Sequence, residues 1–330
     1  MIAAILIVFS SCGFLNSNSD GEDGGYAAYE EILLLRYTPS EIQICAIRPY
    51  GQDLRIICSF KITEITPSNF ESYVTAKWSP DKRYIALIGG PGSTLEYYPI
   101  WLLTSSGSFL RKLTWNALDV IWYDNETIYY TRAKGYFSVQ YDLYRMNIHD
   151  MEERMVYSQT DSTNIYFNSF FDQNNWLSTE MIYGVDISGT QTHEYGEIME
   201  FNIDNKERNY LLHNEEMIEW NPILSPNKNI VVYRARYDTS WAASNLYWFS
   251  MEDRIPHHLT FYSSYNQYQN YKYAWGPNSD KIAVSNPGPV IEGLKYKCLD
   301  VSIIDLQTGL VDTLTHTAQD SISSFVLDWR

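Results

Sequence analysis

The chain has 330 residues, of which 45% are hydrophobic and 15% aromatic, so it holds enough apolar material for a folded core and is not a disordered protein. Lys and Arg number 24 against 40 Asp and Glu, and the resulting net charge of −16 excludes a protein that binds nucleic acid through its phosphates. Four cysteines in this length exclude a small disulfide-stapled scaffold, and the 28 tyrosines and 10 tryptophans favour β-strands.

Residues 1–11 form a short apolar run that ends in two serines before Cys12. A helix needs about 20 apolar residues to span a bilayer, so the run fits the apolar region of a signal peptide better than a membrane helix. Residues 9–12 resemble the lipoprotein box of bacteria, in which the cysteine becomes the lipidated first residue. The basic residues that usually precede the apolar run are missing, and the alternative is a buried N-terminal strand that happens to precede a cysteine. Residues 12–29 are rich in Gly, Ser, Asn and Asp and predict a flexible tether.

From residue 30 onward the sequence predicts short strands and an internal repeat. Three strands are expected at residues 32–37, 42–48 and 53–60. A repeated sequence motif, which we call the phrase, then follows. In it, a strand ends in an aromatic residue, a Ser-Pro-Asp turn comes next and an apolar strand begins. Copies of this phrase lie at residues 76–87, 120–130, 223–232 and 273–284, with a degenerate copy at 170–177 and an opening one at 325–329.

The spacing of these copies defines the repeating unit. The anchor positions 78 and 329 are five periods apart, and (329 − 78)/5 gives about 50 residues per period. Each period also holds a second hairpin, so a unit has four strands, the number in a propeller blade.

The repeated phrases resemble the W-S-P-D-G-x-x-I-A motif of TolB-type β-propellers, which are periplasmic relatives of WD-repeat proteins. Pro and Asp or Asn in the turn suit a type I turn, and the Trp is expected to pack between adjacent blades. The Gly of the motif is absent from every copy, and the residues in its place are Lys82, Glu126, Lys228 and Ser279. The resemblance covers nearly all of residues 30–330 and implies an all-β, six-bladed propeller with four-stranded antiparallel blades. A β-sandwich is the alternative, but it does not explain phased copies.

The two ends of the repeat predict how the ring closes. The last copy supplies an inner strand with nothing after it, while the strands at 32–37, 42–48 and 53–60 lack an inner strand before them. We therefore expect Ser323–Trp329 to become the innermost strand of the first blade, which leaves no open sheet edge.

No motif in the sequence predicts catalysis, a metal or a cofactor. The pattern S-x-x-K occurs at Ser79 and Ser225, but the helix and companion motifs of penicillin-binding enzymes are missing, and no G-x-S-x-G is present. The histidines lack zinc-site spacing, although lyases built on related propellers hold a divalent metal with scattered histidines, which spacing does not exclude. These histidines are residues 149, 193, 213, 257, 258 and 316.

Cys45 and Cys58 flank a hairpin turn at Gly51. They either face each other across the strands as a disulfide or remain buried thiols, and the sequence leaves both open.

The longest predicted loops carry aromatic residues and all lie on one face of the propeller. Exposed aromatics in long loops favour a recognition surface, and the alternative is that they pack on each other as lids. One of these loops is expected at residues 189–196. The candidate ligand-binding residues are Tyr97, Tyr98, Tyr136, Tyr195, Trp241, Tyr265 and Tyr268.

Taken together, these features predict a lipoprotein of the bacterial cell envelope. A signal peptide (1–11) and a lipidated tether (12–29) would anchor a propeller (30–330) to a membrane, in the periplasm or at the cell surface. The favoured function is a non-enzymatic binding or scaffold platform for a protein or glycan partner. The alternative is a glycan-active lyase or hydrolase with its site at the central channel.

Overall fold

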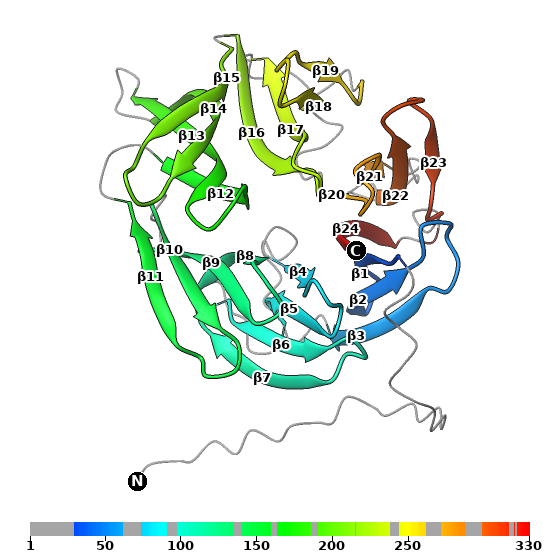
Figure 1. Cartoon of the computed structure of the whole chain (residues 1–330). Coiled ribbons are helices and arrows are strands. Elements are labelled where there is room, and N and C mark those ends of the chain that lie inside the picture. The colour runs from blue at the N-terminus through cyan, green and yellow to red at the C-terminus, as the bar shows by residue number, and fades with distance from the viewer. Residues whose placement is uncertain are drawn as a thin grey trace, which may run out of the picture.

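The computed structural model describes residues 30–61, 74–90, 98–134, 140–159, 164–185, 191–214, 216–237, 244–261, 272–287, 299–316, 320 and 322–330. Six four-stranded antiparallel sheets are arranged as blades around a common axis (Figure 1). The all-β, six-bladed β-propeller predicted from the sequence is therefore confirmed. No helix within these ranges is long and apolar enough to cross a membrane.

Each blade runs from an inner strand at the axis to an outer strand at the rim. We number the blades 1 to 6 in chain order, and blade 1 consists of β24, β1, β2 and β3. The inner strands are β24 (Ser323–Trp329), β4 (Thr75–Trp78), β8 (Ala117–Trp122), β12 (Asn164–Phe170), β16 (Met217–Leu224) and β20 (Tyr273–Trp275). The second strands are β1 (Ile32–Tyr37), β5 (Tyr84–Ile88), β9 (Thr127–Ala133), β13 (Asn175–Val185), β17 (Ile230–Tyr237) and β21 (Lys281–Pro287).

The two outer positions of each blade are occupied in the same order. The third strands are β2 (Glu41–Ile47), β6 (Ile100–Thr104), β10 (Tyr141–Asn147), β14 (Gln191–Asn202), β18 (Asn245–Ser250) and β22 (Leu299–Asp305). The outer strands are β3 (Arg55–Lys61), β7 (Phe109–Thr114), β11 (Glu153–Ser158), β15 (Arg208–Leu212), β19 (His257–His258) and β23 (Val311–Thr313).

The ring is closed by β24, as the sequence predicted. This strand pairs antiparallel with β1, from Ile32 opposite Trp329 to Tyr37 opposite Ser323. The Glu31 backbone N–H donates to the Arg330 carbonyl at 2.8 Å, which extends the ladder beyond the strand ends. In Figure 1 the C-terminus lies near the axis between β1 and β20. The first and last parts of the chain thus share one blade, which removes a free edge from the sheet.

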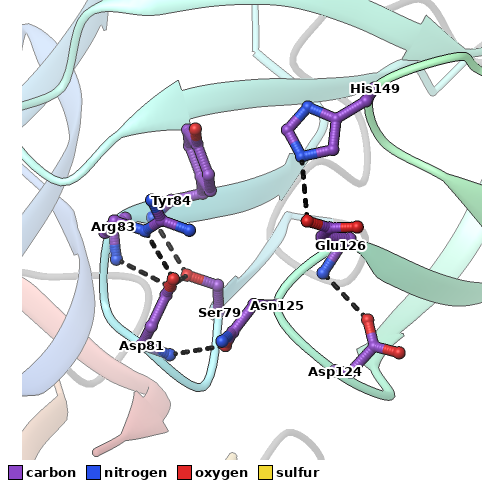
Figure 2. A network of polar contacts seen from close by, with 8 residues as sticks. All are labelled: Ser79, Asp81, Arg83, Tyr84, Asp124, Asn125, Glu126 and His149. Atoms are coloured by element: carbon purple, nitrogen blue, oxygen red, sulfur yellow. Dashed lines mark hydrogen bonds and ion pairs between the residues drawn. The ribbon is translucent and has the colours of Figure 1, made fainter.

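The Ser-Pro-Asp turns are held by their own side chains. The Ser79 hydroxyl donates to Asp81 at 2.7 Å and accepts the backbone N–H of Tyr84 at 3.0 Å, while Arg83 Nε lies 2.5 Å from the same carboxylate (Figure 2). Burial opposes ionisation of Asp81, but the hydrogen bonds from Ser79 and Arg83 outweigh it and hold the pKa of this carboxyl below its usual range. The turn at Ser225 repeats the serine contacts, with Asn227 in place of the aspartate.

Three of the four residues that replace the motif's glycine adopt the backbone conformation that glycine favours. Lys82, Lys228 and Ser279 have φ angles of 59°, 62° and 63°. Glu126 does not, because its turn is one residue shorter: Trp122 pairs with Ile128, six positions on, whereas Trp78 pairs with Ile85, seven positions on. The motif geometry therefore persists where its glycine has been lost.

Tryptophans of the repeat lie between blades, as expected. The indole of Trp122 in blade 3 donates to the Lys77 carbonyl of blade 2 at 2.9 Å. The indole of Trp275 in blade 6 makes the equivalent bond to the Ile223 carbonyl of blade 5 at 3.2 Å. Each of these hydrogen bonds joins two neighbouring inner strands. The residues that define the repeat therefore also hold neighbouring blades together near the axis.

The connections fall on two faces. The turns from the first to the second strand and from the third to the fourth strand share one face, which we call the turn face. In blade 3, for example, the Ile148 N–H of one turn donates to the Glu126 carbonyl of the other at 2.8 Å. The remaining connections lie on the opposite face, which we call the loop face.

The strand assignment corrects one expectation from the sequence, the length of a loop, and settles another, the pairing of two cysteines. The loop predicted at 189–196 is shorter, because residues 191–196 belong to β14. Cys58 lies opposite Ile44, and Cys45 lies opposite Ile56, because the register shifts between Ile44 and Cys45. The two thiols pack into different interblade clusters, so Cys45 and Cys58 do not form a disulfide with each other.

Candidate functional site

The predicted loop-face residues are placed only in part by the structure. Tyr98 is 8% exposed and packs in the cluster between blades 2 and 3, beside Ile100 and Val120. The backbone of Tyr195 lies in β14 opposite Ile182. The other candidates lie outside the described residues, as does Cys12; they are Tyr97, Tyr136, Trp241, Tyr265 and Tyr268.

A hollow of 320 Å³ opens at the axis on the turn face. All six inner strands contribute to its wall near their C-terminal ends, so it is one mouth of the central channel. Residues that represent the six strands are Lys77, Trp122, Phe170, Leu224, Trp275 and Trp329. We call it the turn-side hollow.

Three of the charged groups of the turn-side hollow bind one another, while Lys228 donates to the Phe171 carbonyl. Lys77 Nζ donates to the Leu327 carbonyl at 2.8 Å and lies 3.8 Å from Asp328, and Arg330 Nε lies 3.8 Å from the same carboxylate. Asp328 also accepts the backbone N–H of Trp78 at 2.9 Å. These contacts join the closing strand β24 to β4, so they fasten blade 1 to blade 2.

A second group of charges, Asp119 and Lys272, interacts with Lys77. Burial and the nearby positive charge of Lys77 lower the pKa of Lys272 to about 8, against the opposing charge of Asp119. Burial also raises the pKa of Asp119, which Lys77 and Lys272 only partly offset. Lys272, just before β20, donates to the carbonyl of Val74, just before β4, so it links blades 6 and 2, the two neighbours of blade 1.

A separate pocket of 250 Å³ lies in the wall between blades 4 and 5. Its residues belong to the halves of β12, β13, β16 and β17 that are nearer the loop face. They are Tyr166, Thr179, Met181, Ile218, Trp220, Asn221 and Arg236. We call it the loop-side pocket, and β17 leads from it directly into the segment that contains Trp241.

A β-bulge shapes this pocket. The register of β16 against β17 shifts between Trp220 and Ile223, and Asn221 has a φ of 52°. The Asn221 carbonyl accepts a hydrogen bond from the Tyr273 hydroxyl of blade 6, while the residue itself is exposed. Bulges re-aim side chains next to binding sites, and here the bulge turns an amide into the pocket wall.

Two arginines flank the indole of Trp220. The guanidinium carbon of Arg234 lies 5.0 Å from the ring centroid, and that of Arg236 lies 6.0 Å from it. Both distances fall in the range of cation–π contacts. Arg234 is buried and donates to the Ser244 hydroxyl at 3.0 and 3.2 Å.

Three buried carboxylates lie on strands of blades 4 and 5: Glu180 of β13, Glu197 of β14 and Glu219 of β16. Glu219 of β16 is 1% exposed, and burial together with the charge of Glu197 raises its pKa to about 8. Glu197 bonds to His213 Nδ1. Glu180 bonds to the Tyr210 hydroxyl at 2.6 Å. None of these carboxyl groups lines either opening.

The described histidines do not converge. His149 lies 3.7 Å from Glu126 on the turn face, and His257 and His258 stack on Trp248 and Tyr247. Across the described ranges, no three His, Cys, Asp or Glu residues are grouped so that they could hold a metal ion. Ser79 and Ser225, the serines of the S-x-x-K pattern, are buried and hold their turns.

Sequence reasoning missed the residues of the loop-side pocket. The signal available was Pro222 beside Trp220 and Asn221 in a predicted inner strand, since proline inside a sheet marks a bulge or an edge. Arg236 carries no local signal, because only the register of β17 against β16 brings it to Trp220.

Comparison with known proteins identifies the fold. No family model and no curated protein matches the sequence. Among solved structures, TolB from Acinetobacter baumannii is 14% identical with a TM-score of 0.61, over 92% of this chain and 67% of that one. A putative TolB from Agrobacterium tumefaciens is 14% identical with a TM-score of 0.52, over 92% and 98% of the two chains. A putative 6-phosphogluconolactonase from Bacteroides fragilis is 9% identical with a TM-score of 0.51, over 93% and 99%. The fold is thus that of the TolB-type propeller, as the repeated motif predicted.

Proposed function

We propose that this chain is a lipoprotein of the bacterial envelope whose propeller binds a protein partner on the loop face. The observation that carries the proposal is the loop-side pocket, which brings Tyr166, Trp220 and Arg236 together. Tyr, Trp and Arg are the residue types that dominate the binding energy of protein interfaces. The resemblance to TolB-type propellers supports the same function, because such propellers commonly serve an envelope complex.

We expect the predicted loop residues to extend this surface. Trp241 follows β17 by four positions, and β17 itself ends beside the pocket at Arg236 and Tyr237. Tyr265 and Tyr268 come from the next connection on the same face. Aromatic rings give a large contact area with few rotatable bonds to immobilise, and they also stack on sugar rings, so a glycan is the other partner class to test.

The proposal is tested by comparing the two faces in the cell. A photo-crosslinking residue at Trp241 or Tyr265 is expected to capture one specific partner, while the same residue at Lys82 or Lys228 of the turn face captures none. With that partner purified, Trp241→Ala and Tyr265→Ala should each weaken binding by about 1 kcal/mol or more. Lys82→Ala and Lys228→Ala should leave it unchanged. The reverse pattern would place the site on the turn face and refute the proposal.

A further inference from the structure

The loop-side pocket contains a cation that has no counter-ion among the described residues. Arg236 is half-buried and lines the pocket, and within the described ranges no carboxylate or carbonyl oxygen bonds to its guanidinium. Its guanidinium carbon lies 6.0 Å from the centroid of the Trp220 indole.

Three other partly buried arginines of the blades are paired with carboxylates. Arg55 lies 2.9 Å from Glu31, Arg132 lies 2.9 Å from Glu153, and Arg208 lies 3.2 Å from Glu180. A partly buried charge is costly to leave without a partner, since its lost hydration is not replaced. A ligand that supplies an anion would remove this cost at Arg236.

The surroundings of Arg236 favour an anion as well. The buried guanidinium of Arg234 lies on the same indole, 5.0 Å from its centroid, so two positive charges flank one ring. The exposed Asn221 lines the pocket and adds an amide donor. The remaining wall is largely apolar and includes Met181 and Ile218.

The size of the pocket limits what enters it. Its 250 Å³ is below the roughly 300–1,000 Å³ of sites that enclose a whole small molecule. It therefore suits one or two side chains, or a chain end, of a larger partner. A phosphate group carries about two charges and three strong acceptor oxygens, and it needs more donors than one unpartnered guanidinium and one amide.

We propose that the loop-side pocket binds a carboxylate that stands next to an apolar side chain in a protein partner. Arg236 receives the carboxylate in a charge-assisted hydrogen bond, and the indole of Trp220 receives the apolar group. This inference rests on the proposed function, because it names the chemistry that the loop face recognises.

The test uses N-acetyl-phenylalanine as the probe and its uncharged amide as the matched control, with binding to the full chain followed by ligand-detected NMR. The acid is expected to bind about tenfold more tightly than the amide, the ratio expected for one hydrogen bond to a charged group. Arg236→Gln should abolish this preference, and Arg236→Lys should restore part of it. Trp220→Leu should weaken both probes equally. Arg254→Gln, a change on the turn face of the same blade, should have no effect.

Three results would overturn the inference: equal binding of acid and amide, an unchanged preference in Arg236→Gln, or tighter binding of phenyl phosphate than of the acid. Unchanged melting temperatures of the variants show that the fold is retained. If crosslinking at Trp241 still captures a partner while Arg236→Gln does not alter probe binding, the inference fails and the proposed function stands. If crosslinking captures nothing at the loop face, the proposed function fails first.

Discussion

Glu219 shows how burial controls the charge of a single residue in this propeller. Its carboxyl is buried between blades 4 and 5, and its Oε2 has no hydrogen-bond partner within the described part of the chain. Burial and the charge of Glu197 raise its pKa from 4.5 to about 8. Between these two values the folded protein keeps a proton that the unfolded chain has lost. The free energy of unfolding therefore falls as the pH rises through this window.

Glu219→Gln should remove this pH dependence. We expect the free energy of unfolding of the variant, relative to the natural chain, to rise by up to about 1.4 kcal/mol per pH unit between pH 5 and 8. Urea unfolding of both proteins at each pH measures the difference. Two curves that run parallel across this range would contradict the assignment.

Residues with a positive φ angle offer a second test at the residue scale, which concerns the cost of backbone strain. Lys206 (φ 62°) and Gly309 (φ 68°) occupy equivalent positions in the turns that follow the third strands of blades 4 and 6. A Cβ atom placed on Gly309 would meet no atom within 4 Å, so a substitution there changes the backbone strain alone. We expect Gly309→Ala to lower the free energy of unfolding by about 1 kcal/mol and Lys206→Gly to raise it by a similar or smaller amount. Thermal melts of both variants check this. Shifts of equal sign would show that φ does not decide stability in these turns.

At the scale of elements, we expect β24 to contribute most to the stability of the ring, because it contacts strands of two blades. It pairs with β1, and its Asp328 binds Lys77 and the backbone of Trp78 in β4. Removing it would expose the edge of β1 and release the contacts that hold blade 2 to blade 1. In a closed ring, every blade depends on two neighbours, so the loss extends beyond one sheet.

Deletion of residues 321–330 should therefore abolish cooperative unfolding. We expect a broad, non-cooperative denaturation curve by circular dichroism in place of a single sharp transition. Deletion of residues 13–25, in the predicted tether, is the matched control and should leave the transition unchanged. A truncated protein with the melting behaviour of the full chain would show that β24 does not close the ring.

The sequence predicted these elements well because the repeat encodes them locally. Ser79 and Asp81 specify a turn two residues apart, Trp122 of the next copy of the repeat makes an interblade bond, and the copies are in phase. Other features depend on register, which local patterns do not encode. The β-bulge at Asn221 shapes the loop-side pocket, and a register shift at Cys45 separates the two thiols. Of the predicted binding residues only Tyr98 has a described side chain, and its ring is buried.

At the scale of the molecule, the entry point of the chain sets the orientation of the two faces. Glu31 bonds to Arg330, and the Glu30 carboxylate accepts the Asn278 amide of a blade 6 turn at 3.2 Å. The chain therefore enters the propeller at the turn face. If the tether is anchored at Cys12, the turn face points to the membrane and the loop face points away from it, towards an arriving partner.

Cys12→Ala tests the anchor on which this orientation depends. A single acyl chain holds a protein to a membrane only marginally, whereas several chains hold it stably, so lipidation of both the thiol and the amine of Cys12 predicts firm attachment. We expect the natural chain in the membrane fraction and the Cys12→Ala variant in the soluble fraction. Cys45→Ala, a change at a buried thiol of the propeller, is the matched control and should stay with the membrane. Identical fractionation of the natural chain and the Cys12→Ala variant would rule out a lipid anchor at this cysteine, and with it the membrane-facing assignment of the turn face.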